Sequence, residues 1–242
     1  MKKKIPVFCV PFAGGSAFSF SAWKNVTPTG LDFVGLELPG HGKRVREPLL
    51  TNYEDMVDDL LDQIEIPLDM PYVMYGHSLG AMLAYHMVQK LQERGEKLPM
   101  YLVVSGRRGP SIELTNREKY KLPQQEFFNM LKRDNGCPKE VLEDQEMLEY
   151  FEPALRADFK ASETYVHPDK PMLRVPILAM VGDNEEATLS ELKAWQAETS
   201  TPIVVKQISG DHFFIFENKE KVMRLMARTL QHELSARHPE MR

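Results

Sequence analysis

The pentapeptide Gly76-His77-Ser78-Leu79-Gly80 constrains this 242-residue chain most, because of what stands on either side of it. An apolar run over 72–75 precedes it, and helix-forming residues with apolar positions three and four apart follow over 81–91. A G-x-S-x-G pattern between a strand and a helix is typical of a sharp turn that presents a serine hydroxyl. The glycines are needed because a side chain at either position would collide with neighbouring backbone. The pattern therefore predicts a nucleophilic Ser78; the alternative is a serine that only caps a helix between two glycine turns.

Short apolar strands alternate with helices along most of the chain. This alternation predicts an α/β fold with a mostly parallel central sheet and helices on both of its faces. The expected strands cover 5–10, 31–38, 72–75, 100–105, 175–181 and 202–208, and the expected helices cover 51–66, 81–91, 187–199 and 218–236.

The stretch 109–170 interrupts this alternation. It shows helical patterns over 124–131, 139–142 and 147–165 and no convincing strand. A helical insertion between two strands of such a sheet most simply covers the carboxyl ends of the strands, where these folds bind ligands. An unusually long crossover is the alternative. We predict a core over 1–108 and 171–234, a helical lid segment over 109–170, and a flexible polar tail over 235–242.

Composition argues against several classes of protein. The net charge of −5 at pH 7 argues against nucleic acid or an anionic membrane as the main partner. The basic N-terminus is followed by an apolar stretch that Pro6 and Pro11 interrupt, so we expect neither a signal peptide nor a membrane-spanning segment there. Cys9 and Cys137 are far apart and lack the spacing of metal ligands, so we expect a cytoplasmic protein without a metal site.

A base must accept the serine proton before the hydroxyl becomes a good nucleophile. In serine hydrolases with this order of strands and helices, the acid and then the histidine follow the serine along the chain. His212 is the candidate base because its loop follows the expected strand 202–208, on the same side of the sheet as Ser78. A solvent-exposed loop histidine is the alternative. Other histidines are less suitable as the base. His77 is beside the serine, His167 is in the lid segment, and His232 and His238 are near the C-terminus.

The remaining groups of such a site are a carboxylate and two backbone N–H donors. The carboxylate should follow the strand before the histidine loop, where three acidic residues compete within 183–186. Leu79 is expected to supply one N–H of an oxyanion hole. Ala13 is expected to supply the other, since Gly14 and Gly15 let that loop face the site; a glycine turn with no catalytic part is the alternative.

Five stretches together resemble the type II thioesterases that accompany nonribosomal peptide and polyketide synthetases. They span nearly the whole chain and are 11–16, 37–42 with Arg44, 76–80, 153–159 with Glu163 and Tyr165, and 210–214. The serine turn is shared by all α/β-hydrolases. The opening loop, the lid stretch and the histidine loop together are far more specific.

The resemblance implies an α/β-hydrolase fold and hydrolysis of acyl groups from the phosphopantetheine arm of acyl or peptidyl carrier proteins. Ser78 would form the acyl-enzyme, and His212 would act first as base and then as acid. The protein would need no cofactor, because the arm belongs to its partner. It would act as a monomer on small acyl thioesters, without nucleic acid or membrane.

One departure from the family pattern concerns the acid. The family usually places an aspartate three residues after the glycine that ends the strand, and this position is Glu185 here. Asp183 occupies the intermediate position. We predict Glu185 as the acid, with Asp183 as the alternative.

Two other functions stay open at this point. Apolar lid residues could line a tunnel for longer chains in a medium-chain acyl-carrier-protein thioesterase or a general carboxylesterase, although residues at helical spacing more often form packed core. These are Phe127, Phe128, Leu131, Leu148 and Phe151. A non-catalytic carrier-binding protein on a hydrolase fold is the third possibility, and only the unusual acid position supports it.

Two basic clusters could attract the acidic surface that carrier proteins usually present. They are Lys43, Arg44 and Arg46, and Arg107 with Arg108.

Overall fold

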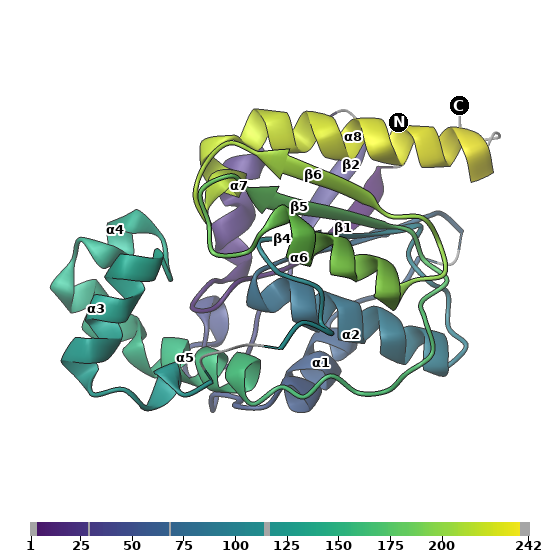
Figure 1. The fold of residues 1–242 in the computed structure, drawn as a ribbon. Helices are drawn as coiled ribbons and strands as arrows, with labels where there is room; N and C mark the ends of the chain where they lie inside the picture. The colour runs from purple at the N-terminus through teal and green to yellow at the C-terminus, as the bar shows by residue number, and fades with distance from the viewer. Residues whose placement is uncertain (1–3, 29, 68, 114–116, 238–242) are drawn as a thin grey trace.

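A parallel sheet with the strand order β2-β1-β3-β4-β5-β6 forms the centre of the molecule (Figure 1). The computed structural model describes residues 4–28, 30–67, 69–113 and 117–237. The strands are β1 (Ile5–Val10), β2 (Leu31–Gly35), β3 (Val73–His77), β4 (Tyr101–Ser105), β5 (Ile177–Gly182) and β6 (Val204–Ile208). All described strand pairs are parallel, which confirms the predicted fold class.

Helices cover both faces of this sheet, as predicted (Figure 1). The helices α1 (Tyr53–Asp62), α2 (Leu79–Glu93) and α6 (Leu189–Lys193) lie on one face, and α8 (Lys219–Arg237) lies on the other. Shorter turns of helix complete the core: η1 (Ala17–Trp23), η2 (Gly42–Arg44), η4 (Ala194–Glu198) and α7 (Phe214–Glu217). None of the described helices is long and apolar enough to cross a membrane.

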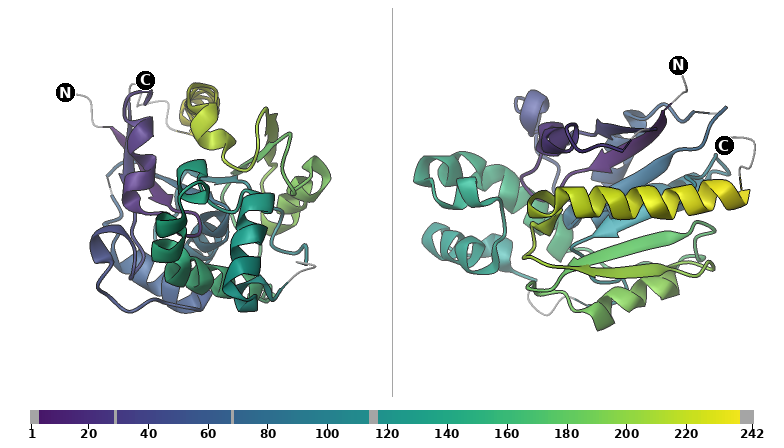
Figure 2. Two further views of the ribbon diagram at one scale, coloured as in Figure 1. Left: turned by 90° about the vertical axis from the view of Figure 1, so that its left-hand side faces the viewer. Right: turned by 90° about the horizontal axis from the view of Figure 1, so that it is seen from above.

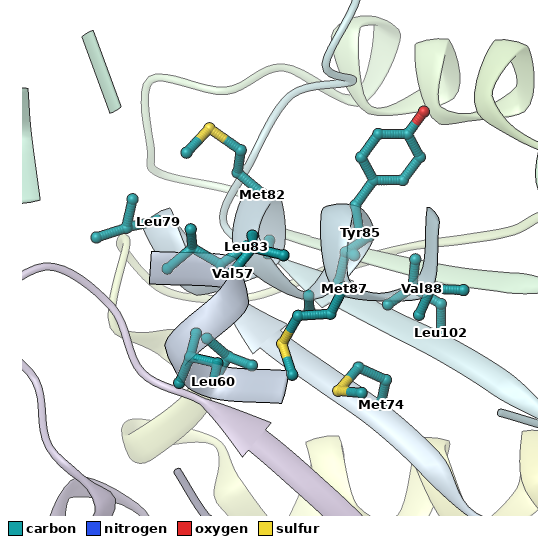
Figure 3. Packing of buried hydrophobic residues seen from close by; sticks show 14 of the residues in the cluster. Val57, Leu60, Met74, Leu79, Met82, Leu83, Tyr85, Met87, Val88 and Leu102 are labelled. Atoms are coloured by element: carbon teal, nitrogen blue, oxygen red, sulfur yellow. The ribbon is translucent and has the colours of Figure 1, made fainter. Parts of the chain in front are cut away.

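The central strand β3 is buried on both faces, which explains why such strands have apolar residues at every position. Successive side chains of a strand point to opposite faces. Met74 packs with Leu60 and Leu83 between the sheet and α1 and α2 (Figure 3). Its neighbours Val73 and Tyr75 belong to the cluster on the α8 side. Both faces of β3 are therefore buried, and a polar position on either face would cost stability.

The lid segment forms a cluster of helices beyond the carboxyl ends of β5 and β6 (Figures 1 and 2). It contains η3 (Lys119–Lys121), α3 (Gln124–Asp134), α4 (Lys139–Leu142) and α5 (Gln145–Glu163). These helices enclose a small hydrophobic core of their own. The buried residues Phe127, Phe128, Leu131 and Leu148 belong to it, and the partly buried Phe151 packs against it, so the packed-core interpretation of these residues is confirmed. The division into core, lid and tail stays a prediction.

Several element boundaries differ from the sequence prediction, for example that of α1, which ends at Asp62 and not at residue 66. The strand β2 ends at Gly35, three residues early, because the chain then turns through Gly40, which has φ 79°. The helix expected over 187–199 is divided into α6 and the 3-10 turn η4. The helix α8 continues to Arg237, three residues into the expected tail, because Ala236 and Arg237 are good helix formers. Residues 1–3 and 238–242 lie outside the described residues.

Candidate active site

The turn between β3 and α2 holds Ser78 in a conformation that few non-glycine residues adopt, with φ 55° and ψ −116°. Its N–H donates to the carbonyl of Ser105 at 2.8 Å. A Cβ added at Gly76 would lie 2.0 Å from the carbonyl oxygen of Gly80, and one added at Gly80 would lie 2.2 Å from the carbonyl oxygen of Val10. Backbone atoms cannot move aside, so the structural requirement for both glycines is confirmed.

The sheet topology places this turn where such folds bind ligands. The strand β1 lies between β2 and β3, so the chain reverses its direction across the sheet between β1 and β3. Ligands bind outside the carboxyl ends of strands at such a point. A cavity of about 750 Å³ lies there, and both Ser78 and His212 line it. Met130 of α3 and Phe159 of α5 also line it.

His212 is held by a buried carboxylate. Its Nδ1 lies 2.7 Å from Oε2 of Glu185, whose side chain is 3% exposed. The second oxygen of Glu185 accepts the N–H of Gly182 at 2.6 Å. Since a carboxylate oxygen accepts, Nδ1 carries the hydrogen and Nε2 is left with a free lone pair. This arrangement fixes the ring tautomer that a general base needs.

Asp183, the alternative acid, has a different partner. Its Oδ1 accepts the N–H of Gly210 at 2.9 Å, and its own N–H donates to the carbonyl of Ile208. These bonds shape the loop that carries His212. The structure therefore brings Glu185, and not Asp183, to the histidine, while Glu186 forms an ion pair with Arg108 at 3.0 Å.

The two expected oxyanion donors come from two segments, the opening loop and the start of α2. Ala13 lines the cavity. Leu79 is the first residue of α2, where helix N–H groups have no intrahelical acceptor, and its side chain is buried in the core. The next amide of the opening loop, that of Gly14, donates to Oδ2 of Asp158 on α5 at 2.7 Å.

A family model named thioesterase domain matches residues 5–230 of this chain. The chain belongs to the thioesterase family. Among curated proteins it is 32% identical over 229 residues to the gramicidin S biosynthesis protein GrsT of Aneurinibacillus migulanus, covering 94% of this chain and 90% of that protein.

Solved structures of thioesterases share the fold of this thioesterase. The structure of ClbQ from the colibactin NRPS/PKS pathway matches it with a TM-score of 0.91 and 29% identity, covering 97% of this chain and 100% of that one. The type II thioesterase BorB from the borrelidin biosynthetic cluster matches with a TM-score of 0.85 and 28% identity, covering 94% of each chain. The α/β-hydrolase fold implied by the sequence resemblance is confirmed. ClbQ comes from an NRPS/PKS pathway and BorB is a type II thioesterase of a biosynthetic cluster, in agreement with the resemblance.

A second buried histidine–carboxylate pair in the thioesterase was missed by the sequence reasoning. Nε2 of His41 lies 3.0 Å from Oδ2 of Asp158, and both side chains are almost fully buried. Nδ1 of His41 lies 3.0 Å from the carbonyl of Pro39, which can only accept, so Nδ1 carries a hydrogen. The carboxylate of Asp158 accepts from Nε2 in the same way. His41 is therefore an imidazolium beside Asp158, and the only sequence signal was that both residues stand in stretches that resemble the family.

This pair lies directly behind the opening loop. The same oxygen of Asp158 accepts the N–H of Gly14, which has φ 73°. One turn earlier on α5, Leu155 packs so closely that a Cβ at Gly14 would lie 2.7 Å from its Cδ2. The helix α5 of the lid segment thus holds the loop that presents Ala13 to the cavity.

The His41–Asp158 pair makes a pH-dependent contribution to stability. Burial alone would lower the pKa of His41, but the hydrogen bond and charge of Asp158 outweigh burial, and the net pKa is raised above 6.5. A pKa that is higher in the folded than in the unfolded state stabilises the protein below about pH 6.5, and this stabilisation is lost as the pH rises through the folded value.

We expect His41→Gln to reduce the free energy of unfolding by about 3 kcal/mol at pH 6, since it leaves the carboxylate of Asp158 without its charge partner. The difference from wild type should shrink as the pH is raised to 9. Urea unfolding at a series of pH values measures it. The same substitution in an Asp158→Asn background is the control, and it should show no such trend. A difference that grows with pH would contradict the assignment of His41 as an imidazolium.

The ring of His77 lies against the ring of His212. The two ring centroids are 4.8 Å apart, and Nδ1 of His77 lies 2.9 Å from Oγ of Ser105. Burial, and then the neighbouring His212, holds the pKa of His77 well below its ordinary value. His77 therefore stays neutral and adds no positive charge beside His212.

Proposed function

We propose that this thioesterase hydrolyses acyl and aminoacyl groups from the phosphopantetheine arm of carrier proteins, as an editing, type II enzyme of natural-product biosynthesis. The observation that supports this most is the shared cavity: Ser78 on its strained turn lines it together with His212, which is held by Glu185. Family membership provides the reaction class, and the names of the relatives point to pathways that use carrier proteins.

Each residue has a defined part in the proposed reaction. His212 accepts the proton of Ser78 as the hydroxyl attacks the thioester carbonyl, and Glu185 stabilises the imidazolium that forms. The N–H groups of Ala13 and Leu79 bind the oxyanion. The imidazolium of His212 gives this proton to the departing pantetheine sulfur, and the neutral His212 then activates a water molecule that hydrolyses the acyl-enzyme. No cofactor or metal takes part in this scheme.

The lining of the cavity favours small or polar acyl groups over a medium-length chain. Charged side chains line much of it, among them Arg107, Lys119, Asp134 and Glu163. The apolar lid residues that a tunnel would need are packed in the separate core of the lid segment. Long acyl chains are therefore expected to be poor substrates.

Carrier proteins would dock on a limited set of basic residues, with the thioesterase acting as a monomer. Arg44 is occupied within the chain, because its guanidinium binds Asp59 and Glu47 at 2.6 Å each. Lys43 and Arg46 are exposed beside it and could meet an acidic carrier surface.

A panel of carrier proteins loaded with acetyl, aminoacyl, hexanoyl and decanoyl groups tests this function. We expect the wild-type enzyme to discharge the short groups fastest and to act more slowly on simple oxygen esters of the same acids. Release of the acyl group is followed by the mass of the carrier protein. If the enzyme discharges none of these carriers, or if Ser78→Ala discharges them equally, the proposal fails.

The non-catalytic alternative is separated by a covalent probe. A fluorophosphonate reacts with an activated serine and should label Ser78 in the wild-type protein. A carrier-binding protein without activity would bind the loaded carriers and remain unlabelled.

A further inference from the structure

One positive charge in the cavity is not used by the proposed mechanism. Arg107 follows β4 and lines the same cavity as Ser78. Its Nη1 lies 2.7 Å from Oγ of Ser162 on α5, and its Nη2 lies 3.4 Å from Sδ of Met82 on α2. A hydroxyl and a thioether are both neutral and are weak partners for a guanidinium.

The other arginine and lysine side chains that line the cavity have carboxylate partners. The pairs are Arg108 with Glu186 at 3.0 Å and Glu191 at 3.1 Å, Lys119 with Asp134 at 3.2 Å, and Arg133 with Asp134 at 2.7 Å. Within the part of the chain that the structure describes, Arg107 has no carboxylate at ion-pair distance. The cavity therefore contains one cation whose charge no group among the described residues neutralises.

Such an arrangement is costly without a ligand. Burial lowers the pKa of Arg107 to about 10, so the guanidinium is still charged at neutral pH. A charge removed from water is normally paired with an opposite charge. A guanidinium has five N–H donors in a fixed fork that matches carboxylate and phosphate oxygens, and its two protein contacts leave donors for a ligand.

We propose that Arg107 binds an anionic group of the thioester substrate, either a carboxylate on the acyl chain or a phosphate of the pantetheine arm. This inference rests on the proposed function. The position of Arg107 favours the carboxylate. It directly follows Gly106, where an added Cβ would lie 3.0 Å from Cε1 of His212, so Arg107 starts one residue from the reacting groups. A short acyl group on Ser78 with a terminal carboxylate would reach this region, whereas the phosphate stands at the far end of the arm.

Pairs of pantetheine thioesters that differ in one charge test the carboxylate. Malonyl would be compared with propionyl, and succinyl with butyryl, each as a thioester of pantetheine without its phosphate. Arg107→Gln is expected to lower kcat/KM for at least one of the two carboxyacyl thioesters about tenfold more than for its neutral counterpart. Arg108→Gln is the matched control, because this neighbouring arginine lines the same cavity and is already ion-paired; it should leave both ratios unchanged.

The phosphate is tested with one neutral acyl group on pantetheine and on 4′-phosphopantetheine. A loss in Arg107→Gln that is confined to the phosphorylated thioester would assign the site to the arm. If neither comparison depends on Arg107, the inference is wrong.

An equilibrium measurement separates this inference from the proposed function and needs no Arg107 variant to fold. The Ser78→Ala protein is titrated with the same thioesters in a calorimeter. We expect about tenfold tighter binding of the anionic member in at least one comparison, and equal affinities throughout would overturn the inference. Should the wild-type enzyme hydrolyse no thioester of either kind, the proposed function would fail while this binding result still decides whether the cavity binds an anionic group.

Discussion

Ser78→Ala is expected to lower kcat for acyl-carrier thioesters by a factor of about 10⁴ to 10⁶, the range found when a nucleophile that acts together with its base is removed. The substitution deletes the hydroxyl and leaves the backbone turn, because the neighbouring glycines and the bond from the Ser78 N–H to Ser105 do not involve the side chain. Binding of the thioester should therefore change little.

Single-turnover assays with a pantetheine thioester measure the chemical step, and fluorophosphonate labelling measures the reactive serine directly. Ser209→Ala, on the exposed start of the histidine loop, is the control and should retain activity and labelling. A Ser78→Ala enzyme that keeps more than a few per cent of the wild-type rate would exclude the acyl-enzyme route.

Glu185→Gln is expected to lower kcat by about 10⁴-fold, as an acid-to-amide change does in other serine hydrolases. Both oxygens of Glu185 accept hydrogen bonds, one from Nδ1 of His212 and one from the N–H of Gly182. A glutamine has one acceptor oxygen and one NH₂ donor, so it must leave one of these two N–H groups facing another donor. The ring of His212 then loses the tautomer or the position that it needs.

Asp183→Asn is the matched comparison for this prediction. The asparagine oxygen can still accept the N–H of Gly210, so we expect less than a tenfold loss of kcat. Steady-state kinetics of both variants on one loaded carrier decide between the two carboxylates. An active Glu185→Gln beside an inactive Asp183→Asn would transfer the part of the acid to Asp183.

The sequence was sufficient to predict most elements of the fold because its signals are local. Strands buried on both faces are apolar throughout, and the serine turn between Gly76 and Gly80 permits few other structures. The same locality explains why Ser78 and His212 could be named: each follows a strand, and parallel strands bring their carboxyl ends to one edge.

The carboxylate partner of His212 is harder to predict from the sequence than Ser78 or His212. Asp183 and Glu185 stand two residues apart and differ by one methylene in reach. Their partners depend on how the chain turns after Gly182, where the Asp183 N–H bonds to Ile208 and its carboxylate to Gly210. These contacts are tertiary, so no local pattern predicts them.

The pair formed by His41 and Asp158 was missed for a related reason. The two residues are separated by 117 positions and only the packing of α5 brings them together. Taken alone, His41 resembles any polar residue of a loop, and Asp158 resembles any polar residue of a helix. The charge of Arg107 was visible in the sequence, but it was assigned to a possible outer surface, whereas the structure places it in the cavity.

The contacts of α5 with the opening loop show which helix of the lid segment can be changed when the enzyme is engineered. Leu155 and Asp158 are fastened to Gly14, so sequence changes on this side of α5 would displace the amide of Ala13 and reduce every activity together. Met130 on α3 lines the cavity without such an attachment. Libraries that aim to alter acyl preference should vary α3 and keep the inner face of α5 constant.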